Sequence, residues 1–211
     1  MSAPTLEVVR HPLIEHKLSH LRDKRTGHRR FKALLEEIAL LMTFHATRHL
    51  EGEETAFDTP LESMRACRIH EDRLVVVPIL RAGLGMVEGV LRLIPGARVG
   101  HLGFYRNEET LLPVRYYGKL PPDPARRSFL MVDPMLGTGG TATAAASELK
   151  ERGARDIRFM CLVAAPEGAA RMAEVHPDVP VYTAALDRRL NDAGYILPGL
   201  GDAGDRVFGT Q

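Results

Sequence analysis

The sequence has little cysteine, no excess of either charge and no long apolar run. Its 211 residues include two cysteines, and 28 Lys and Arg stand against 27 Asp and Glu. This balance argues against a protein that binds nucleic acid or an anionic membrane through many phosphate contacts, so any anion site must be local. No apolar run reaches the ~18 residues of a transmembrane helix, and residues 1–10 lack the apolar core of a secretory signal. We therefore expect a cytoplasmic protein with no nucleic-acid or membrane partner.

What the sequence does contain favours one globular domain. Its hydrophobic content is 45%, and a chain of this length can bury a full core. Cys161 lies in the apolar run 159–165, where we expect a small buried thiol. We expect a single domain made of three parts: a helical N-terminal part at 1–70, an α/β core at 71–185 and a C-terminal segment at 186–211.

Two kinds of hydrophobic pattern predict the secondary structure. Apolar residues recur at three- and four-residue steps over 31–42, as one face of a helix requires, and a shorter helix is expected over about 13–23. From residue 74 onward, short apolar runs alternate with helical stretches. The expected strands are 74–80, 98–105, 128–132, 157–164 and 181–184, and the expected helices are 85–93, 140–152 and 167–176. This alternation predicts an α/β fold with a mostly parallel sheet flanked by helices.

The loop after the expected strand 128–132 carries the most specific chemistry. Ligands bind at the carboxyl ends of strands in such sheets, and here Asp133 is followed by a loop of glycine and threonine and by an Ala-rich helix. The start of that helix offers unpaired N–H groups and a partial positive charge, which suit a phosphate, while Asp133 can accept hydrogen bonds from ribose hydroxyls. Thr138 and Thr141 add hydroxyl donors. The loop is neither a Walker motif nor a dinucleotide fingerprint, and the alternative is a glycine-rich turn that only starts a helix.

This segment resembles the motif with which type I phosphoribosyltransferases bind 5-phosphoribosyl diphosphate (PRPP). Most of those enzymes have a second acid where this chain has Pro134, and the variant with proline is similar to the uracil phosphoribosyltransferase family. Departures are mild, because Gly137 stands where many members have Ala, and Thr141 where Ser is frequent. The resemblance extends from His11 to Thr210 and implies the type I phosphoribosyltransferase fold.

Three other segments resemble the same family, in the same order along the chain. The run 77–85 ends a strand with Arg81 and small residues, and the resemblance implies that this arginine contacts PRPP. Segment 105–117 resembles the β-hairpin lid of the fold, with Arg106 as a PRPP contact. Segment 194–206 resembles the base-binding segment, whose fixed N–H groups suit the 4-oxo group of uracil and oppose the 4-amino group of cytosine. Taken singly, the first segment is also compatible with a surface turn, the second with a solvated loop and the third with a disordered tail.

The resemblance implies that the protein joins uracil to PRPP with Mg²⁺, giving UMP and diphosphate. It implies catalytic roles for Asp133, Arg81 and Arg106. It implies PRPP contacts at Arg81, Arg106, Asp133, Pro134, Met135, Leu136, Gly137, Thr138, Gly139, Gly140, Thr141 and Asp202, and uracil contacts at Ile196, Gly201, Asp202 and Ala203. It further implies a homo-oligomer, dimer or tetramer, and a cis peptide bond between Leu80 and Arg81, while a GTP effector stays open. The group that removes the proton from N1 of uracil is unassigned.

Two further patterns in the sequence could indicate other sites. His45 and His49 have the spacing of a metal pair on a helix, but no third ligand is evident, and a surface pair is favoured. The basic residues between Arg22 and Arg30 could bind RNA or a nucleotide, although a solvated helix boundary is favoured. An RNA-binding regulator of pyrimidine genes on the same fold is the second function considered, and a PRPP-binding module without catalysis is the third. Pro134 and the C-terminal Gly-Asp-Ala run favour the enzyme.

Overall fold

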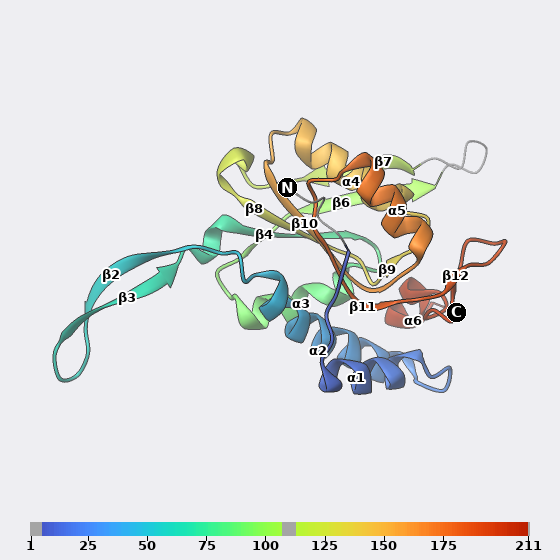
Figure 1. The fold of residues 1–211 in the computed structure, drawn as a ribbon, viewed down its shortest axis with the longest axis horizontal. Coiled ribbons are helices and arrows are strands. Elements are labelled where there is room, and N and C mark those ends of the chain that lie inside the picture. The colour runs from blue at the N-terminus through green and yellow to red at the C-terminus, as the bar shows by residue number, and fades with distance from the viewer. Residues whose placement is uncertain (1–5, 107–112, 211) are drawn as a thin grey trace.

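The computed structural model describes residues 6–106 and 113–210 and is built around one twisted sheet (Figure 1). The order of the strands is β1-β11-β10-β8-β4-β6-β7, with β5 paired to β4 and β9 paired to β10. All of these pairs are parallel except β6 with β7. The strands are β1 (Glu7–Val8), β4 (Leu74–Leu80), β5 (Arg98–Val99), β6 (His101–Arg106), β7 (Pro113–Lys119), β8 (Ser128–Val132), β9 (Met135–Leu136), β10 (Asp156–Ala164) and β11 (Val181–Leu186).

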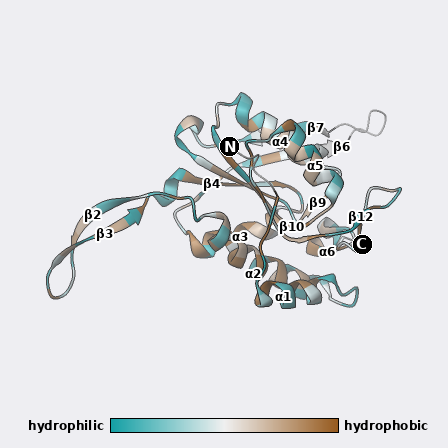
Figure 2. Ribbon diagram, in the orientation of Figure 1, coloured by the Kyte–Doolittle hydropathy of each residue, from teal (hydrophilic) through white to brown (hydrophobic). Residues whose placement is uncertain are grey.

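Helices cover both faces of the sheet and divide the core in two. On one face lie α1 (Pro12–Arg22), α2 (His28–Ala46), α3 (Leu84–Leu93) and α6 (Ala203–Phe208), and on the other α4 (Gly140–Glu151) and α5 (Pro166–Val175). The two cores alternate along β4, because Leu74 and Val76 pack toward the first group of helices and Val75 and Val77 toward the second. The central strands accordingly bury hydrophobic side chains on both faces of the sheet. Figure 2 colours the ribbon by residue hydropathy.

Local sequence explains how these elements begin and how closely they pack. Pro12 starts α1, and the side chain of His11 accepts a hydrogen bond from the backbone N–H of Leu13. Helices α2 and α3 approach closely because Gly89 has no side chain: a Cβ there would lie 2.3 Å from the carbonyl oxygen of Glu36. Cys161 is fully buried, and burial raises the pKa of its thiol to about 12.

The sequence-based expectations for the core are confirmed. The expected helices and strands are present with their ends within a few residues, except that the strand expected over 98–105 is divided at Gly100 into β5 and β6. The mostly parallel sheet flanked by helices is the predicted fold class. The expected hairpin is also present, since β6 and β7 pair in antiparallel fashion. Its expected tip, 107–110, lies outside the described residues. The peptide bond between Leu80 and Arg81 is cis, as expected, and that between Leu197 and Pro198 is cis as well.

The expectation of a helical part over 1–70 is wrong for its last third. There β2 (Gly52–Asp58) and β3 (Ser63–Ile69) form a two-stranded antiparallel hairpin, which we call the arm; it extends away from the body of the molecule (Figure 1). Both strands are largely exposed on both faces, so the sequence carries no apolar stripe from which a strand could be read. Two short strands near the C-terminus, β12 (Arg189–Leu190) and β13 (Ile196–Leu197), and the 3₁₀ turns Glu71–Arg73 and Pro124–Arg126 complete the described elements.

Among the described residues, no helix combines the length and the hydrophobicity needed to cross a membrane.

Candidate active site

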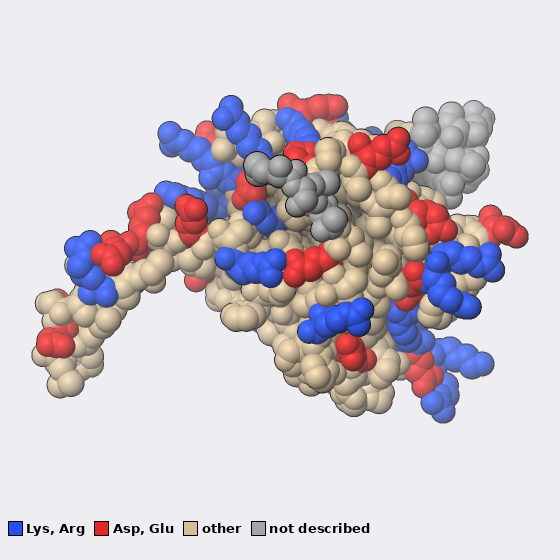
Figure 3. All heavy atoms as spheres, in the orientation of Figure 1, with Lys and Arg blue, Asp and Glu red and all other residues tan. Residues whose placement is uncertain are grey.

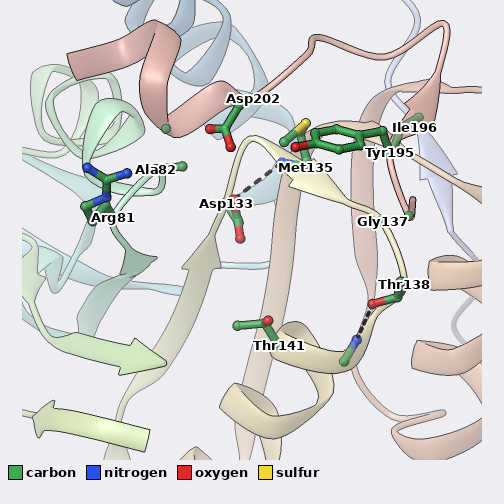
Figure 4. Close-up of a pocket in the computed structure, with 13 residues that line it drawn as sticks. Arg81, Ala82, Asp133, Met135, Gly137, Thr138, Thr141, Tyr195, Ile196 and Asp202 are labelled. Carbon is green, nitrogen blue, oxygen red and sulfur yellow. Dashed lines mark hydrogen bonds between the residues drawn. The ribbon is translucent and has the colours of Figure 1, made fainter. Parts of the chain in front are cut away.

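A cavity of about 420 Å³ opens at the carboxyl ends of β4 and β8, where an α/β sheet binds its ligands. It is lined by three stretches of chain that are far apart in sequence: the turn after β4, the loop between β8 and α4, and a C-terminal stretch at the start of α6 (Figure 4). The second and third of these form its two walls. The lining residues are Arg81, Ala82, Asp133, Met135, Gly137, Thr138, Gly140, Thr141, Gly194, Tyr195, Ile196, Asp202 and Gly204.

The first wall is the loop 133–141, which we call the phosphate loop. Its backbone is fixed by the neighbouring strand, because β9 within the loop pairs with β10 and the carbonyl oxygen of Pro134 accepts hydrogen bonds from the amides of Leu162 and Val163. Gly139 caps α4 with φ of +78°, a left-handed conformation that favours glycine. The first amides of α4 are thereby presented at the cavity, where they can donate to a phosphate.

Asp133 is the first residue of the phosphate loop and directly follows the buried strand β8. One of its oxygens accepts a long, 3.5 Å contact from the amide of Met135. Among the described residues no cation bonds to this carboxyl group, and burial raises its pKa to about 7. A cationic or hydroxyl-bearing ligand would supply the partner that the carboxylate lacks.

Arg81 stands on the opposite side of the cavity from Tyr195 (Figure 4). It follows β4, its side chain is 59% exposed, and its guanidinium lies 3.4 Å from a carboxylate oxygen of Asp205. Gly83, two residues later, permits a tight turn, because a Cβ there would be 2.4 Å from the carbonyl oxygen of Val132. An exposed arginine at such a turn is available for a charge-assisted contact with a polyanion.

The second wall is the stretch 194–203, which we call the base segment. It contains β13, the cis peptide before Pro198, and Gly199 and Gly201 with φ of +64° and +70°. Asp202 caps α6, since its side chain accepts a hydrogen bond from the amide of Asp205. Ile196 is buried, whereas the ring of Tyr195 is about half exposed at the cavity.

Most of the residues expected from the sequence meet at this cavity. The structure places Arg81, Asp133, Met135, Gly137, Thr138, Gly140, Thr141, Ile196 and Asp202 along its lining. Pro134, Leu136 and Gly139 are buried in the loop behind the lining and shape it from within. Ala203 is buried at the start of α6, and Gly201 lines a neighbouring hollow. The side chain of Arg106 lies outside the described part of the chain.

Four lining residues were missed in the sequence: Ala82, Gly194, Tyr195 and Gly204. Three are small residues that leave no chemical signature. Tyr195 could have been found, because it is an aromatic residue between a glycine and the predicted uracil contact Ile196. Gly168 of α5 was missed for another reason: a Cβ there would lie 2.3 Å from the carbonyl oxygen of Gly137, a contact between segments that no local pattern shows.

The carboxylates fit a divalent cation that is held mainly by its substrate. Among the described residues, no group of three or more His, Cys, Asp or Glu side chains could enclose a metal ion. His45 pairs instead with Glu7, and His49 contacts Ser128, so they form no metal pair. Asp133 and Asp202 both face the cavity, which suits Mg²⁺ because this ion usually binds one or two carboxylates together with waters and phosphate oxygens.

Comparisons with known proteins agree with this geometry. A family model described as uracil phosphoribosyltransferase matches residues 8–210. The uracil phosphoribosyltransferase of Geobacillus kaustophilus is 59% identical over 201 residues, which cover 95% of this chain and 96% of that protein. That of Macrococcus caseolyticus is 56% identical over 206 residues, covering 98% of this chain and 99% of its own.

Solved structures show the same fold. A protein from Aquifex aeolicus superimposes with a TM-score of 0.92 at 38% identity, covering 97% of this chain and 98% of that one. A hypoxanthine-guanine phosphoribosyltransferase from Bacillus anthracis superimposes with a TM-score of 0.52 over 76% of this chain and 80% of its own. At 14% identity the second likeness concerns the fold alone. The predicted phosphoribosyltransferase fold is thereby confirmed.

Proposed function

The chain belongs to the uracil phosphoribosyltransferase family, and on that premise we propose that it transfers the phosphoribosyl group of PRPP to N1 of uracil, releasing diphosphate. The observation that carries the proposal is the meeting of two segments at one cavity: a phosphate loop with Asp133, and a base segment that lines the same space. In this proposal residues 1–211 form one domain, in which 71–185 bind PRPP and 186–211 read the base. The product, UMP, places the enzyme in pyrimidine salvage.

The phosphate loop binds the 5-phosphate and the ribose hydroxyls of PRPP. The amides at the start of α4, with the hydroxyls of Thr138 and Thr141, hold the 5-phosphate, and Asp133 accepts hydrogen bonds from the ribose hydroxyls. Arg81 and Arg106 contact the diphosphate. A bond forms between N1 of uracil and C1 of the ribose, the N1 proton is released, and the bond from C1 to the diphosphate oxygen breaks, so negative charge grows on the leaving group. Catalysis then consists mainly of positioning and of stabilising that charge.

The base segment selects uracil through backbone groups. A fixed N–H opposite the 4-oxo group donates a hydrogen bond to uracil, whereas the 4-amino group of cytosine would leave two donors facing each other. The backbone groups that form these hydrogen bonds belong to Ile196, Gly201 and Ala203. Asp202 lines the cavity from the same segment and faces PRPP.

Mg²⁺ is the proposed cofactor. Asp133 and Asp202 would contact it directly or through water, and the ion would neutralise charge on the diphosphate. Burial raises the pKa of Asp133 to about 7 in the ligand-free enzyme, so a nearby cation would favour the charged form of this carboxyl group.

A homo-oligomer, dimer or tetramer, is part of the proposal, and the arm supports it. Two-stranded hairpins are marginally stable by themselves, yet this one extends from the body with large apolar side chains in solvent. Leu61 at its tip is 95% exposed, and Met64 and Ile69 are also exposed. We propose that the arm packs on a second copy of the chain. Leu61→Ser should then lower the oligomer fraction in analytical ultracentrifugation, and an unchanged fraction would exclude this contact.

The alternative of an RNA-binding regulator has less support. Figure 3 shows Lys and Arg interspersed with Asp and Glu over the visible face, without the one-signed surface that phosphate contacts require. The proposal has no nucleic-acid or membrane partner and places the enzyme in the cytoplasm. A filter-binding assay with RNA tests the alternative.

The proposed function is tested by measuring product formation with competing bases. Purified enzyme with PRPP and Mg²⁺ should convert uracil to UMP and leave cytosine, orotate and adenine largely unused. Chelation of Mg²⁺ should abolish turnover, and added GTP will decide whether this nucleotide is an effector. Comparable kcat/KM with orotate or adenine, and poor use of uracil, would refute the assignment.

A further inference from the structure

The base segment has little regular structure, yet its backbone is tightly held from the side away from the cavity. Between β13 and α6, the chain runs through residues 198–202 without a helix or a strand. A segment of this kind needs side-chain contacts from elsewhere to keep one conformation. Those contacts come from the end of α1, more than 160 residues earlier in the sequence.

The central contact is an ion pair between Arg22, the last residue of α1, and Asp187, the first residue after β11. The two terminal nitrogens of the guanidinium group, Nη2 and Nη1, donate to the two carboxylate oxygens at 2.7 and 2.8 Å. The side chain of Asp187 is only 6% exposed and that of Arg22 is 21% exposed. The sequence placed Arg22 among solvated basic residues, and this interpretation is wrong for it. A bidentate, largely buried pair is geometrically specific, and losing one partner leaves a buried charge uncompensated.

Both residues of the pair form hydrogen bonds with the backbone of Gly199 in the base segment. The carbonyl oxygen of Gly199 accepts a hydrogen bond from Arg22 at 2.9 Å, and its amide donates to Asp187 at 2.9 Å. Asp187 is itself tied to the sheet, because its amide donates to the carbonyl oxygen of Ala164. Both polar groups of one peptide residue are thus fixed relative to the strands.

Gly199 is in turn tightly packed on a residue that faces the cavity. A Cβ at Gly199 would lie 2.1 Å from the carbonyl oxygen of Ile196, so the two backbones are in direct contact. A second arginine holds the next residue in the same manner: Arg206 donates to the carbonyl oxygen of Leu200 and to that of Asp23, while stacking over Phe31. A shift at the back of the segment is therefore transmitted to the groups that face the base.

We propose that Arg22 and Asp187 are positioning residues that fix the base segment through Gly199 and thereby set the affinity for uracil. The inference rests on the proposed function, because the base segment must bind uracil for the positioning to have a kinetic effect. Neither residue lines the cavity, and in the described part of the chain the hydrogen bonds given above join them to each other, to Gly199 and to Ala164 rather than to the phosphate loop. Their influence should therefore fall on uracil and spare PRPP.

The test compares Michaelis constants for the two substrates in Asp187→Asn and Arg22→Gln. Each change should raise KM for uracil about ten- to a hundredfold, because displacements near 1 Å have effects of this size, and change KM for PRPP less than about threefold. Lys17→Gln is the matched control: Lys17 lies on the same helix, is also 21% exposed and pairs with Glu37, away from the base segment. This control should leave both constants unchanged.

Further variants separate positioning from folding. Arg22→Lys keeps the charge but cannot bind in the same bidentate manner, so it should raise KM for uracil by an intermediate factor even if Asp187→Asn fails to fold. The double variant Arg22→Met with Asp187→Leu replaces the pair by apolar side chains, and should keep a raised uracil KM even where its Tm returns to the wild-type value.

Wild-type formation of UMP is measured first, since its absence refutes the proposed function rather than the positioning role. With an active wild type, equal rises in both Michaelis constants, or a double variant with wild-type KM for uracil, would overturn the inference.

Discussion

The two walls of the cavity are built in different ways. The phosphate loop is contiguous in sequence, since Asp133, the glycines, the threonines and the start of α4 follow each other over 133–141. The base segment depends on contacts with Arg22, Asp187 and Arg206, which come from three other parts of the chain. The first wall is therefore a local motif, while the second is positioned by tertiary structure.

The largest effect is expected at Asp133, the most chemically specific residue of the phosphate loop. Asp133→Asn should leave the fold intact and lower kcat about a hundred- to a thousandfold, because an amide cannot accept at both ends and carries no charge. Steady-state kinetics at saturating PRPP measures this. An unchanged kcat would remove Asp133 from the reaction.

The same variant should be more stable than the wild type at alkaline pH. Burial raises the pKa of Asp133 to about 7, so the folded protein binds a proton more tightly than the unfolded chain does, and stability falls as pH rises from about 4 to about 7. A neutral asparagine side chain at this position avoids that loss. Above pH 7 the Tm of ligand-free Asp133→Asn should exceed that of the wild type by a few degrees, about 1 kcal/mol or more, whereas at pH 4 the two should agree.

Arg81 tests whether the turn after β4 belongs to the PRPP wall. Arg81→Ala should lower kcat/KM for PRPP about ten- to a hundredfold, as expected for a lost charged contact of about 1.5 to 3 kcal/mol. KM for uracil should change less. Arg92→Ala is the matched control, because Arg92 is a similarly exposed arginine on α3, away from the cavity lining. Equal effects of the two variants on PRPP would contradict the role of Arg81.

Substitution by alanine should have opposite effects at two glycines, Gly168 of α5 and Gly137 of the phosphate loop. Gly168→Ala places a Cβ 2.3 Å from the carbonyl oxygen of Gly137, which should cost about 1 to 3 kcal/mol and raise KM for PRPP several-fold. At Gly137 the nearest atoms to a new Cβ are 3.7 Å away or more, so Gly137→Ala should keep KM within about twofold. Thermal melts and PRPP kinetics check both. A reversed order would show that the loop is not clamped by α5.

The smallest effect is expected at Tyr195 of the base segment. Its ring lines the cavity but is half exposed, so stacking on a base should contribute about 1 kcal/mol, the lower end of the usual range. Tyr195→Ala should raise KM for uracil about fivefold and Tyr195→Phe hardly at all. If Tyr195→Phe raises KM for uracil as much as Tyr195→Ala does, the hydroxyl rather than the ring contacts the base.

The contrast between the walls also explains what could be predicted from the sequence. The strands of the core were readable because each is a short apolar run, and the phosphate loop was readable because its chemistry is local. The arm was not, since both of its strands are largely exposed and so show no apolar stripe. Arg22 was misjudged because a basic residue at a helix end looks solvated until its partner, 165 residues later, is known. Gly168 was missed for the same reason.

Hydrogen exchange with each substrate tests the division of the cavity most directly. PRPP with Mg²⁺ should protect amides of the phosphate loop at 137–141, and uracil added to that complex should bring further protection at 196–203. In Asp187→Asn the protection of 137–141 by PRPP should persist, while the protection of 196–203 by uracil should be weaker. Protection of 196–203 by PRPP alone to the full extent, or a uracil footprint on 137–141 instead of the base segment, would contradict the account of two walls with separate tasks.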